Sequence, residues 1–322
     1  MAQNVKLCDL VAVMEGLYPP ATAQQWDAVG LVVGDPEAAV QKVLFAVDPV
    51  ADVVQEAIDW GADAVVTHHP LFLKAVNSVA ATSFKGSVVH QLIRHNIALY
   101  VAHTNADAAS NGVADALADL LGLVDRQPLV VHQGPGAPDA QPGGHAGGPG
   151  TQADGASAGS GQQAIGIGRV GQLAEPVPLE SLARLLSRVL PATAQGVRVA
   201  GDLQATVHRV AVVGGSGDSL FDAVRAAQAD VYITADLRHH PASELREQAH
   251  FEASRLAAGA VSRPYLLDVA HFASEWPWLR HAARDLNQQL EAQGHSPVTT
   301  RVSTIITDPW TAVVGNMAAQ IN

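Results

Sequence analysis

Cysteine and long apolar segments are scarce in this chain of 322 residues. A single cysteine, Cys8, excludes an internal disulfide bond, and we interpret it as a small buried apolar residue of the first helix. No uninterrupted apolar run reaches the roughly 18 residues that a membrane-spanning helix needs. Residues 1–20 lack a basic stretch followed by an apolar one, so we expect no secretory signal and predict a cytoplasmic protein.

Positive charge and aromatic side chains are scarce too. Lys and Arg number 19 against 31 Asp and Glu, which gives a formal net charge of −12, and aromatic residues make up 5%. Because non-specific nucleic-acid affinity comes from clustered Lys and Arg, this charge argues against nucleic acid as a partner and against a transcription-associated factor. The 48% of apolar residues instead indicates a globular chain with an Ala, Val and Leu core.

Strand and helix patterns alternate in two stretches, separated by a segment rich in Gly, Pro, Ala and Ser. This predicts an α/β protein with two related α/β halves, residues 1–130 and 164–322, whose mixed sheets are flanked by helices, and a flexible linker at 131–163. The expected strands are 40–48, 62–70, 97–107, 207–215, 229–236, 263–271 and 298–310, and the expected helices are 50–61, 87–96, 112–123, 218–228, 242–257 and 276–294.

The two halves share a pattern that suggests an internal duplication. One common offset relates the residues of two sets, which are Val43, Ala62, Asp63 and Thr67, and Val210, Ala229, Asp230 and Thr234. With an offset that is larger by one residue, VAHTNAD at 101–107 aligns with VAHFASE at 269–275. Two matches in the same order favour a duplication, although βα units can also resemble one another by chance.

Histidine is frequent, with 14 copies, and several follow predicted strands. Three clusters stand out, and they are His68-His69, His103 with Asp107, and His271 with Glu275. Each motif alone has an ordinary explanation. The doublet could consist of hydrogen-bonded histidines at a strand end, and a carboxylate in a first helical turn favours the helix dipole.

The combination of the three clusters is more informative than any one of them. The carboxyl ends of parallel strands share one edge of a sheet, so clusters at three strand ends come together there. Imidazole and carboxylate without thiolate suit zinc, iron, manganese or nickel. More than four such side chains are too many for one tetrahedral ion, and they suit two bridged ions about 3.5–4 Å apart. Only one complete centre, drawn from both halves, is expected.

Two further segments belong to the second half. Asp236 and His240 could support the metal site or contact a substrate, or they could belong to a capped loop. GGSGDS at 214–219 could bind a phosphate through backbone N–H groups, but a tight turn between strand and helix is the interpretation that we favour.

Six blocks occur in an order that resembles the GTP cyclohydrolase I type 2 family, also described as NIF-three-like dinuclear metal-centre hexamer proteins. They are WDAVGLVVGDP (26–36), THHPLFLK (67–74), AHTNAD (102–107), TADLRHH (234–240), VAHFASE (269–275) and STIITDPW (303–310). The resemblance covers nearly the whole chain except the linker, where some members carry a folded domain. The family's T-G-D motif reads Thr234-Ala235-Asp236 here, and neither departure affects a ligand position.

The resemblance also implies a site and an assembly. It implies a homohexamer in which each chain binds two divalent metal ions, with Glu275 as the bridge and His103 close to the metals without being a firm ligand. The ligands carried over in this way are His68, His69, Asp107, His271 and Glu275.

We therefore expect a metal-dependent hydrolase that opens a purine nucleotide ring, as the family name implies for GTP, with metal-bound hydroxide as the nucleophile. His103 would act as general base or orient the water. The alternative is a metal-binding scaffold or metal-handling protein with little turnover, because the sequence has no convincing nucleotide-phosphate motif. The fold does not fix the substrate, and the identity of the metal stays open.

Overall fold

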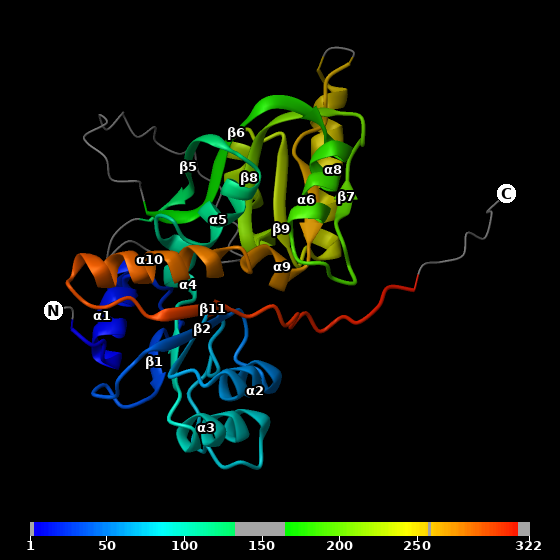
Figure 1. Ribbon diagram of the computed structural model, residues 1–322. Coiled ribbons are helices and arrows are strands. Elements are labelled where there is room, and N and C mark those ends of the chain that lie inside the picture. Colours follow the sequence, from blue (N-terminus) through cyan, green and yellow to red (C-terminus); the bar gives the residue numbers. More distant parts are fainter. Residues whose placement is uncertain (1–2, 133–164, 257–258, 315–322) are drawn as a thin grey trace.

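The computed structural model describes residues 3–132, 165–256 and 259–314, and it contains two mixed sheets flanked by helices (Figure 1). This architecture confirms the predicted fold class. The predicted linker at 131–163 lies outside the described residues except for its first two positions. Among the helices of the described ranges, none combines the length and the hydropathy that crossing a membrane requires.

The first sheet has the strand order β1-β4-β3-β2-β11. All neighbouring strands are parallel except β1, which pairs antiparallel with β4. Alternate side chains of β2 face opposite ways, so Leu44 packs with α2 and α3 while Phe45 packs with α1 and α10. The bounds are β1 Gly30–Val33, β2 Lys42–Ala46, β3 Ala64–Thr67, β4 Ala98–Val101, β11 Thr299–Val302, α1 Leu7–Leu17, α2 Ala51–Trp60, α3 Phe84–Arg94, α4 Thr104–Ala108, α5 Val113–Leu120 and α10 Trp278–Ala292.

The second sheet has the order β5-β6-β8-β9-β10-β7, in which only β8, β9 and β10 are mutually parallel. Val224 of α7 and Leu245 of α8 pack on one face, and Leu186 of α6 belongs to the apolar cluster of the other face. That cluster is continuous with the inner face of the first sheet, so both sheets share one core. The bounds are β5 Val124–Val131, β6 Gly166–Pro178, β7 Arg198–Ala200, β8 Thr206–Ser216, β9 Val231–Ala235, β10 Tyr265–Val269, α6 Leu179–Val189, α7 Phe221–Ala226, α8 His239–Ser254 and α9 His271–Glu275.

The two sheets repeat one topology, as the internal sequence pattern predicts. The order β1-β4-β3-β2 in the first sheet corresponds to β7-β10-β9-β8 in the second. One carboxylate oxygen of Asp63 accepts hydrogen bonds from the backbone N–H groups of residues 41 and 42 on the neighbouring strand, at 2.8 and 2.9 Å. Asp230 does the same for residues 208 and 209, at 2.7 and 2.9 Å. The repeated Ala-Asp pair therefore ties the start of one strand to the next in both halves.

Each half gives one strand to the other half's sheet. β5 follows α5 in the first half but pairs with β6 in the second sheet, and β11 follows α10 in the second half but pairs with β2 in the first sheet. The predicted division at the linker therefore does not coincide with the division between the two sheets, because β5 and β11 each belong to the sheet of the other half. The linker joins the two strands of a hairpin, because the N–H of His132 donates to the carbonyl of Ile165 at 2.9 Å.

Several predicted elements differ in length from those observed. The strand expected over 298–310 ends at Val302, because β2, its only partner, ends at Ala46 in the matching register. The strand expected over 62–70 ends at Thr67, so the histidine doublet lies in the loop beyond it. Cys8 lies on α1 as expected but is partly exposed rather than buried, since the inward positions of that helix are occupied by Leu7, Leu10 and others.

Candidate metal centre

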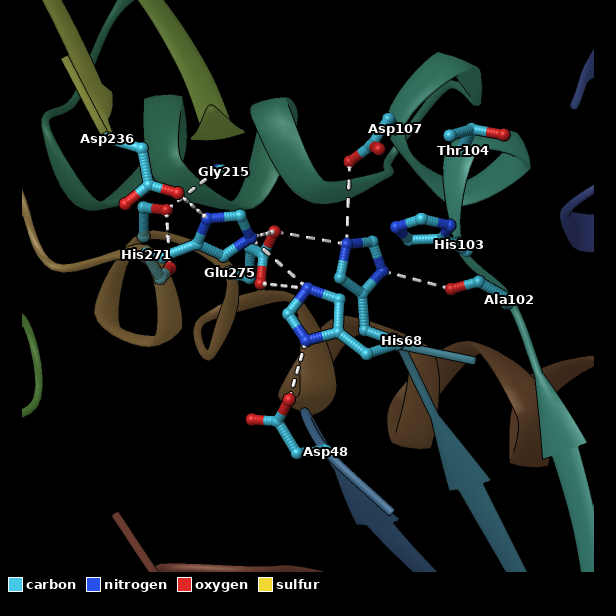
Figure 2. A network of polar contacts seen from close by, with 12 residues as sticks. Asp48, His68, Ala102, His103, Thr104, Asp107, Gly215, Asp236, His271 and Glu275 are labelled. Carbon is cyan, nitrogen blue, oxygen red and sulfur yellow. Dashed lines mark hydrogen bonds and ion pairs between the residues drawn. The ribbon is translucent and has the colours of Figure 1, made fainter. Parts of the chain in front are cut away.

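The three histidine clusters come together between the two sheets (Figure 2). His68 and His69 follow β3, His103 precedes α4, and His271 opens α9 directly after β10. These strands lie in different sheets, and the carboxyl ends of β3, β4 and β10 supply all of the predicted site residues. The Nε2 atoms of His69 and His271, 202 positions apart in the sequence, are 3.2 Å apart. The rule that carboxyl ends of strands gather ligands therefore holds for a pair of sheets.

Glu275 is the centre of this cluster. Its Oε1 lies 2.9 Å from Nε2 of His271 and 3.3 Å from Nε2 of His68, and its Oε2 lies 3.0 Å from Nε2 of His69. Glu275 is 3% exposed and His68 is fully buried, whereas the side chains of His69 and His271 are 22% and 32% exposed. The carboxylate thus forms the floor of the cluster, and two of the imidazoles form its open side.

The other nitrogen of each imidazole is held by an oxygen. Nδ1 of His68 lies 3.0 Å from the carbonyl oxygen of Ala102, Nδ1 of His69 lies 2.7 Å from Asp48, and Nδ1 of His271 lies 2.6 Å from Asp236. An acceptor at Nδ1 fixes the orientation of each ring and points its Nε2 toward Glu275, where that atom becomes a lone-pair donor once a metal ion replaces its proton. All three Nε2 atoms face the same carboxylate in this way, which is the arrangement of histidines that bind a metal ion.

The carboxylate and the imidazoles of the cluster shift one another's pKa values strongly. Burial raises the pKa of Glu275, but the three imidazoles outweigh burial and hold this pKa well below its usual range. Burial lowers the pKa of His271, but Glu275 and Asp236 outweigh burial and raise it to about 10. Nε2 of His68 and Oε2 of Glu275 are buried, and their contacts within the cluster are ion pairs that lack hydrogen-bond geometry. Buried groups of this kind need a partner, and a metal ion between them would satisfy both.

Asp107 and His103 lie on the side of His68 that is remote from His271. Oδ1 of Asp107 is 3.8 Å from Nε2 of His68, and the ring centroid of His103 is 5.2 Å from that of His68. Nδ1 of His103 is 3.0 Å from both oxygens of Asp27, whose side chain is fully buried. Two groups of donors, each with its atoms within 4.8 Å, could hold an ion, and they are His68, His69 and His103, and His69, His271 and Glu275.

The glycine-rich segment at 214–219 contributes backbone rather than a phosphate site. β8 continues through Ser216, and the N–H of Gly215 donates to Oγ of Ser274 at 2.8 Å, so this donor is already used. Gly215 has a φ of +68°, and a Cβ there would lie 2.6 Å from Oε1 of Glu275. Glycine is needed at this position because any side chain would push the carboxylate out of the cluster.

A family model named Duf34/NIF3 (NGG1p interacting factor 3) matches residues 5–309. The chain belongs to this family. It is 48% identical over 312 residues to a GTP cyclohydrolase 1 type 2 homolog of Streptomyces coelicolor, a match that covers 97% of this chain and 95% of the relative. It is 37% identical to a homolog with the same description from Mycobacterium tuberculosis, covering 95% of this chain and 97% of the relative.

Solved structures agree with this membership. A Bacillus cereus protein related to NIF3 superposes with a TM-score of 0.76 at 25% identity, covering 97% of this chain and all of that one (100%). A Staphylococcus aureus protein superposes with the same TM-score of 0.76 at 24% identity, which speaks for the fold alone.

Three residues of this NIF3-family site were not predicted from sequence, and they are Asp27, Asp48 and Gly215. Asp48 follows a predicted strand just as the histidines do, so the same strand-end rule could have found it. Asp27 lies in a loop, and nothing in its spacing links it to His103. Asp236 contacts His271, as one of the two alternatives expected, whereas His240 lies exposed on α8 and no contact described for it reaches the cluster.

Proposed function

We propose that this chain is a metal-dependent hydrolase that holds two divalent metal ions at His68, His69, Asp107, His271 and Glu275. One observation carries the proposal. The Nε2 atoms of three histidines converge on a single buried carboxylate, and each Nδ1 is fixed by an oxygen acceptor. Three imidazoles with fixed orientations rarely converge on one buried carboxylate for packing alone, whereas ligands that share a metal centre are arranged in this way.

The donor set suits a pair of ions that share Glu275. His271 and His69 face its two oxygens from one side, while His68 and Asp107 extend the cluster on the other. Nitrogen and oxygen donors without sulfur fit zinc, iron, manganese or nickel. When bound, two such ions would polarise the group under attack and lower the pKa of a water molecule.

His103 is the residue that we propose to move a proton. The Asp27 carboxylate accepts a hydrogen bond from Nδ1 of His103. It also accepts hydrogen bonds from the N–H and the hydroxyl of Thr104, at 3.1 and 2.6 Å. The imidazole is therefore held in one orientation, with Nε2 as the basic atom. Since His103 lies beside His68 and His69, this base is positioned at the edge of the metal cluster.

The substrate that we propose is a purine nucleotide, opened hydrolytically at its imidazole ring, because both curated relatives described above are named for GTP cyclohydrolase 1 type 2. The test is to load the protein with zinc, manganese, iron or nickel, one at a time, and to follow the ultraviolet absorbance of GTP, which changes when the ring opens. His103→Gln should keep the metals and lose about 10²- to 10⁴-fold in turnover. Turnover by His103→Gln at the wild-type rate would refute its role.

A metal-binding scaffold with little turnover is the second candidate. One observation favours it, which is that the N–H of Gly215 in the glycine-rich segment is bonded to Ser274 and cannot bind a phosphate. Absence of turnover on GTP and on simple phosphoesters, in protein that contains two ions per chain, would favour the scaffold. By resemblance we also propose a homohexamer, which light scattering would test.

A further inference from the structure

Trp26 is an exposed aromatic side chain directly beside the proposed proton carrier. Its side chain is 58% exposed, although the chain has only five tryptophans and Trp278 is completely buried. The Trp26 ring meets the His103 ring edge to face, with centroids 6.0 Å apart. His103 in turn contacts the rings of His68 and His69, so one imidazole separates Trp26 from the metal cluster.

The loop that carries Trp26 is rigidly attached to the site. Asp27, the next residue, is held by His103 and by two hydrogen bonds from Thr104. On the other side of Trp26, the N–H of Gln24 donates to Oγ1 of Thr104 at 2.9 Å. The backbone on both sides of Trp26 is therefore anchored to the residue that follows His103. An aromatic ring held in this way needs little ordering when a ligand binds to it.

The charges around the cluster favour a neutral planar ligand on this side. Among the described residues, each charged group that contacts the cluster's imidazoles through a hydrogen bond or ion pair is a carboxylate, from Asp27, Asp48, Asp107, Asp236 or Glu275. Two divalent ions would be nearly balanced by these five carboxylates, so they would leave little net positive charge to attract a phosphate. A planar ring can instead stack on an indole without an electrostatic cost.

We propose that Trp26 is the stacking surface for the planar nitrogen heterocycle of the substrate, and that it sets the preference of the site for such rings. The inference rests on the proposed function in that the stacked ring would present its edge to Nε2 of His103 and to the metals. It goes beyond that function because it assigns ring recognition to a residue that is neither a metal ligand nor a proton carrier.

The experiment measures binding of guanosine, which has the ring but no phosphate, to the metal-loaded full chain by calorimetry. Stacking on an aromatic side chain is worth about 1–3 kcal/mol per base, so Trp26→Ala should weaken guanosine binding about 5- to 160-fold. Trp26→Phe keeps an aromatic face and should stay within about threefold of the wild type. Phe84→Ala removes an aromatic side chain that is 64% exposed on α3, away from the site, and should change nothing.

Metal content and the molecular mass from light scattering are measured on every variant, so that two kinds of failure are distinguished. Unchanged guanosine affinity in Trp26→Ala, with the metals in place, would overturn the role of Trp26 and leave the proposed function standing. A changed mass in Trp26→Ala would also overturn it, since Trp26 would then contact a second copy of the chain. Failure of the proposed function would appear separately, because wild-type protein would then contain no bound metal.

Discussion

Glu275→Gln removes the charge on which three imidazoles converge and keeps the shape of the side chain. Loss of a group that only orients a metal ligand typically weakens metal affinity 10- to 100-fold. Glu275 lies within 3.3 Å of all three Nε2 atoms, so it is placed as a ligand, and we expect a larger loss, about 100-fold or more. One or both ions should be absent from the purified variant.

The same change has a calculable effect on thermal stability. An ion present at a hundred times its Kd stabilises the native state by about 2.7 kcal/mol. With an unfolding entropy of about 2.1 cal/mol/K per residue, losing that contribution lowers Tm by roughly 4 °C for a chain of this size. In the wild type, adding a chelator should produce at least this decrease. In Glu275→Gln the chelator should have a smaller effect than in the wild type, and none if both ions have already been lost.

Elemental analysis and thermal melting with and without chelator test this prediction. The matched control is Glu291→Gln, which makes the same chemical change at an exposed position of α10 and should alter neither quantity. Full metal content in Glu275→Gln, together with a wild-type Tm that does not respond to chelator, would refute the placement of the site. A metal content near one ion per wild-type chain would refute the dinuclear arrangement alone.

Three further predictions concern the surroundings of the site and the fold. Asp236→Asn weakens the hold on Nδ1 of His271 and should reduce metal affinity 10- to 100-fold, measured by competition with a chelating dye; unchanged affinity would contradict the orienting role. Deletion of residues 134–161, with a short turn closing the β5–β6 hairpin, should leave Tm and metal content unchanged, and loss of folded protein would show that the segment is structural. Arg169→Ala removes the guanidinium that donates to buried Asp115 and to three carbonyl groups, while Asp115 keeps the N–H of Asn111 and the more distant Arg126 as partners. It should lower the free energy of unfolding by about 3–5 kcal/mol in urea denaturation; a decrease under 1 kcal/mol would contradict this.

The parallel core of each half could be predicted from sequence because its signals are local. Apolar runs such as 62–67 end at polar residues, and Gly61 ends α2 in the left-handed conformation that glycine favours. The exchange of β5 and β11 could not be predicted, since a strand's own residues do not identify its partner in a distant part of the chain. β7 has only three residues, too few for a pattern to be distinguished from a loop, and β1 is mostly only partly buried, unlike the fully buried β3 and β4.

The convergence of the histidine clusters could be predicted for a related reason. His68 and His271 each follow an apolar strand, and the edge of a sheet gathers whatever follows its strands. The residues that orient the imidazoles are harder to identify. Asp48 precedes α2, where a single Asp usually caps or flanks the helix, and Asp27 lies in a loop before β1 with no partner signal in its sequence. Only the direction of the histidine rings, which depends on tertiary packing, reveals what these carboxylates do.

The internal duplication explains why one site draws on both halves. Applying the offsets of the sequence repeat pairs the site residues with one another, as His103 with His271, Asp107 with Glu275, His69 with Asp236, and Asp48 with Gly215. Both members of every pair lie at the cluster. Corresponding loops of the two halves therefore meet at the site. Their residues have diverged, so that Glu275 is the centre of the cluster and Asp236 holds Nδ1 of His271 from outside it. Since Glu275 comes from the second half and His68 from the first, neither half alone contains the donors for two ions.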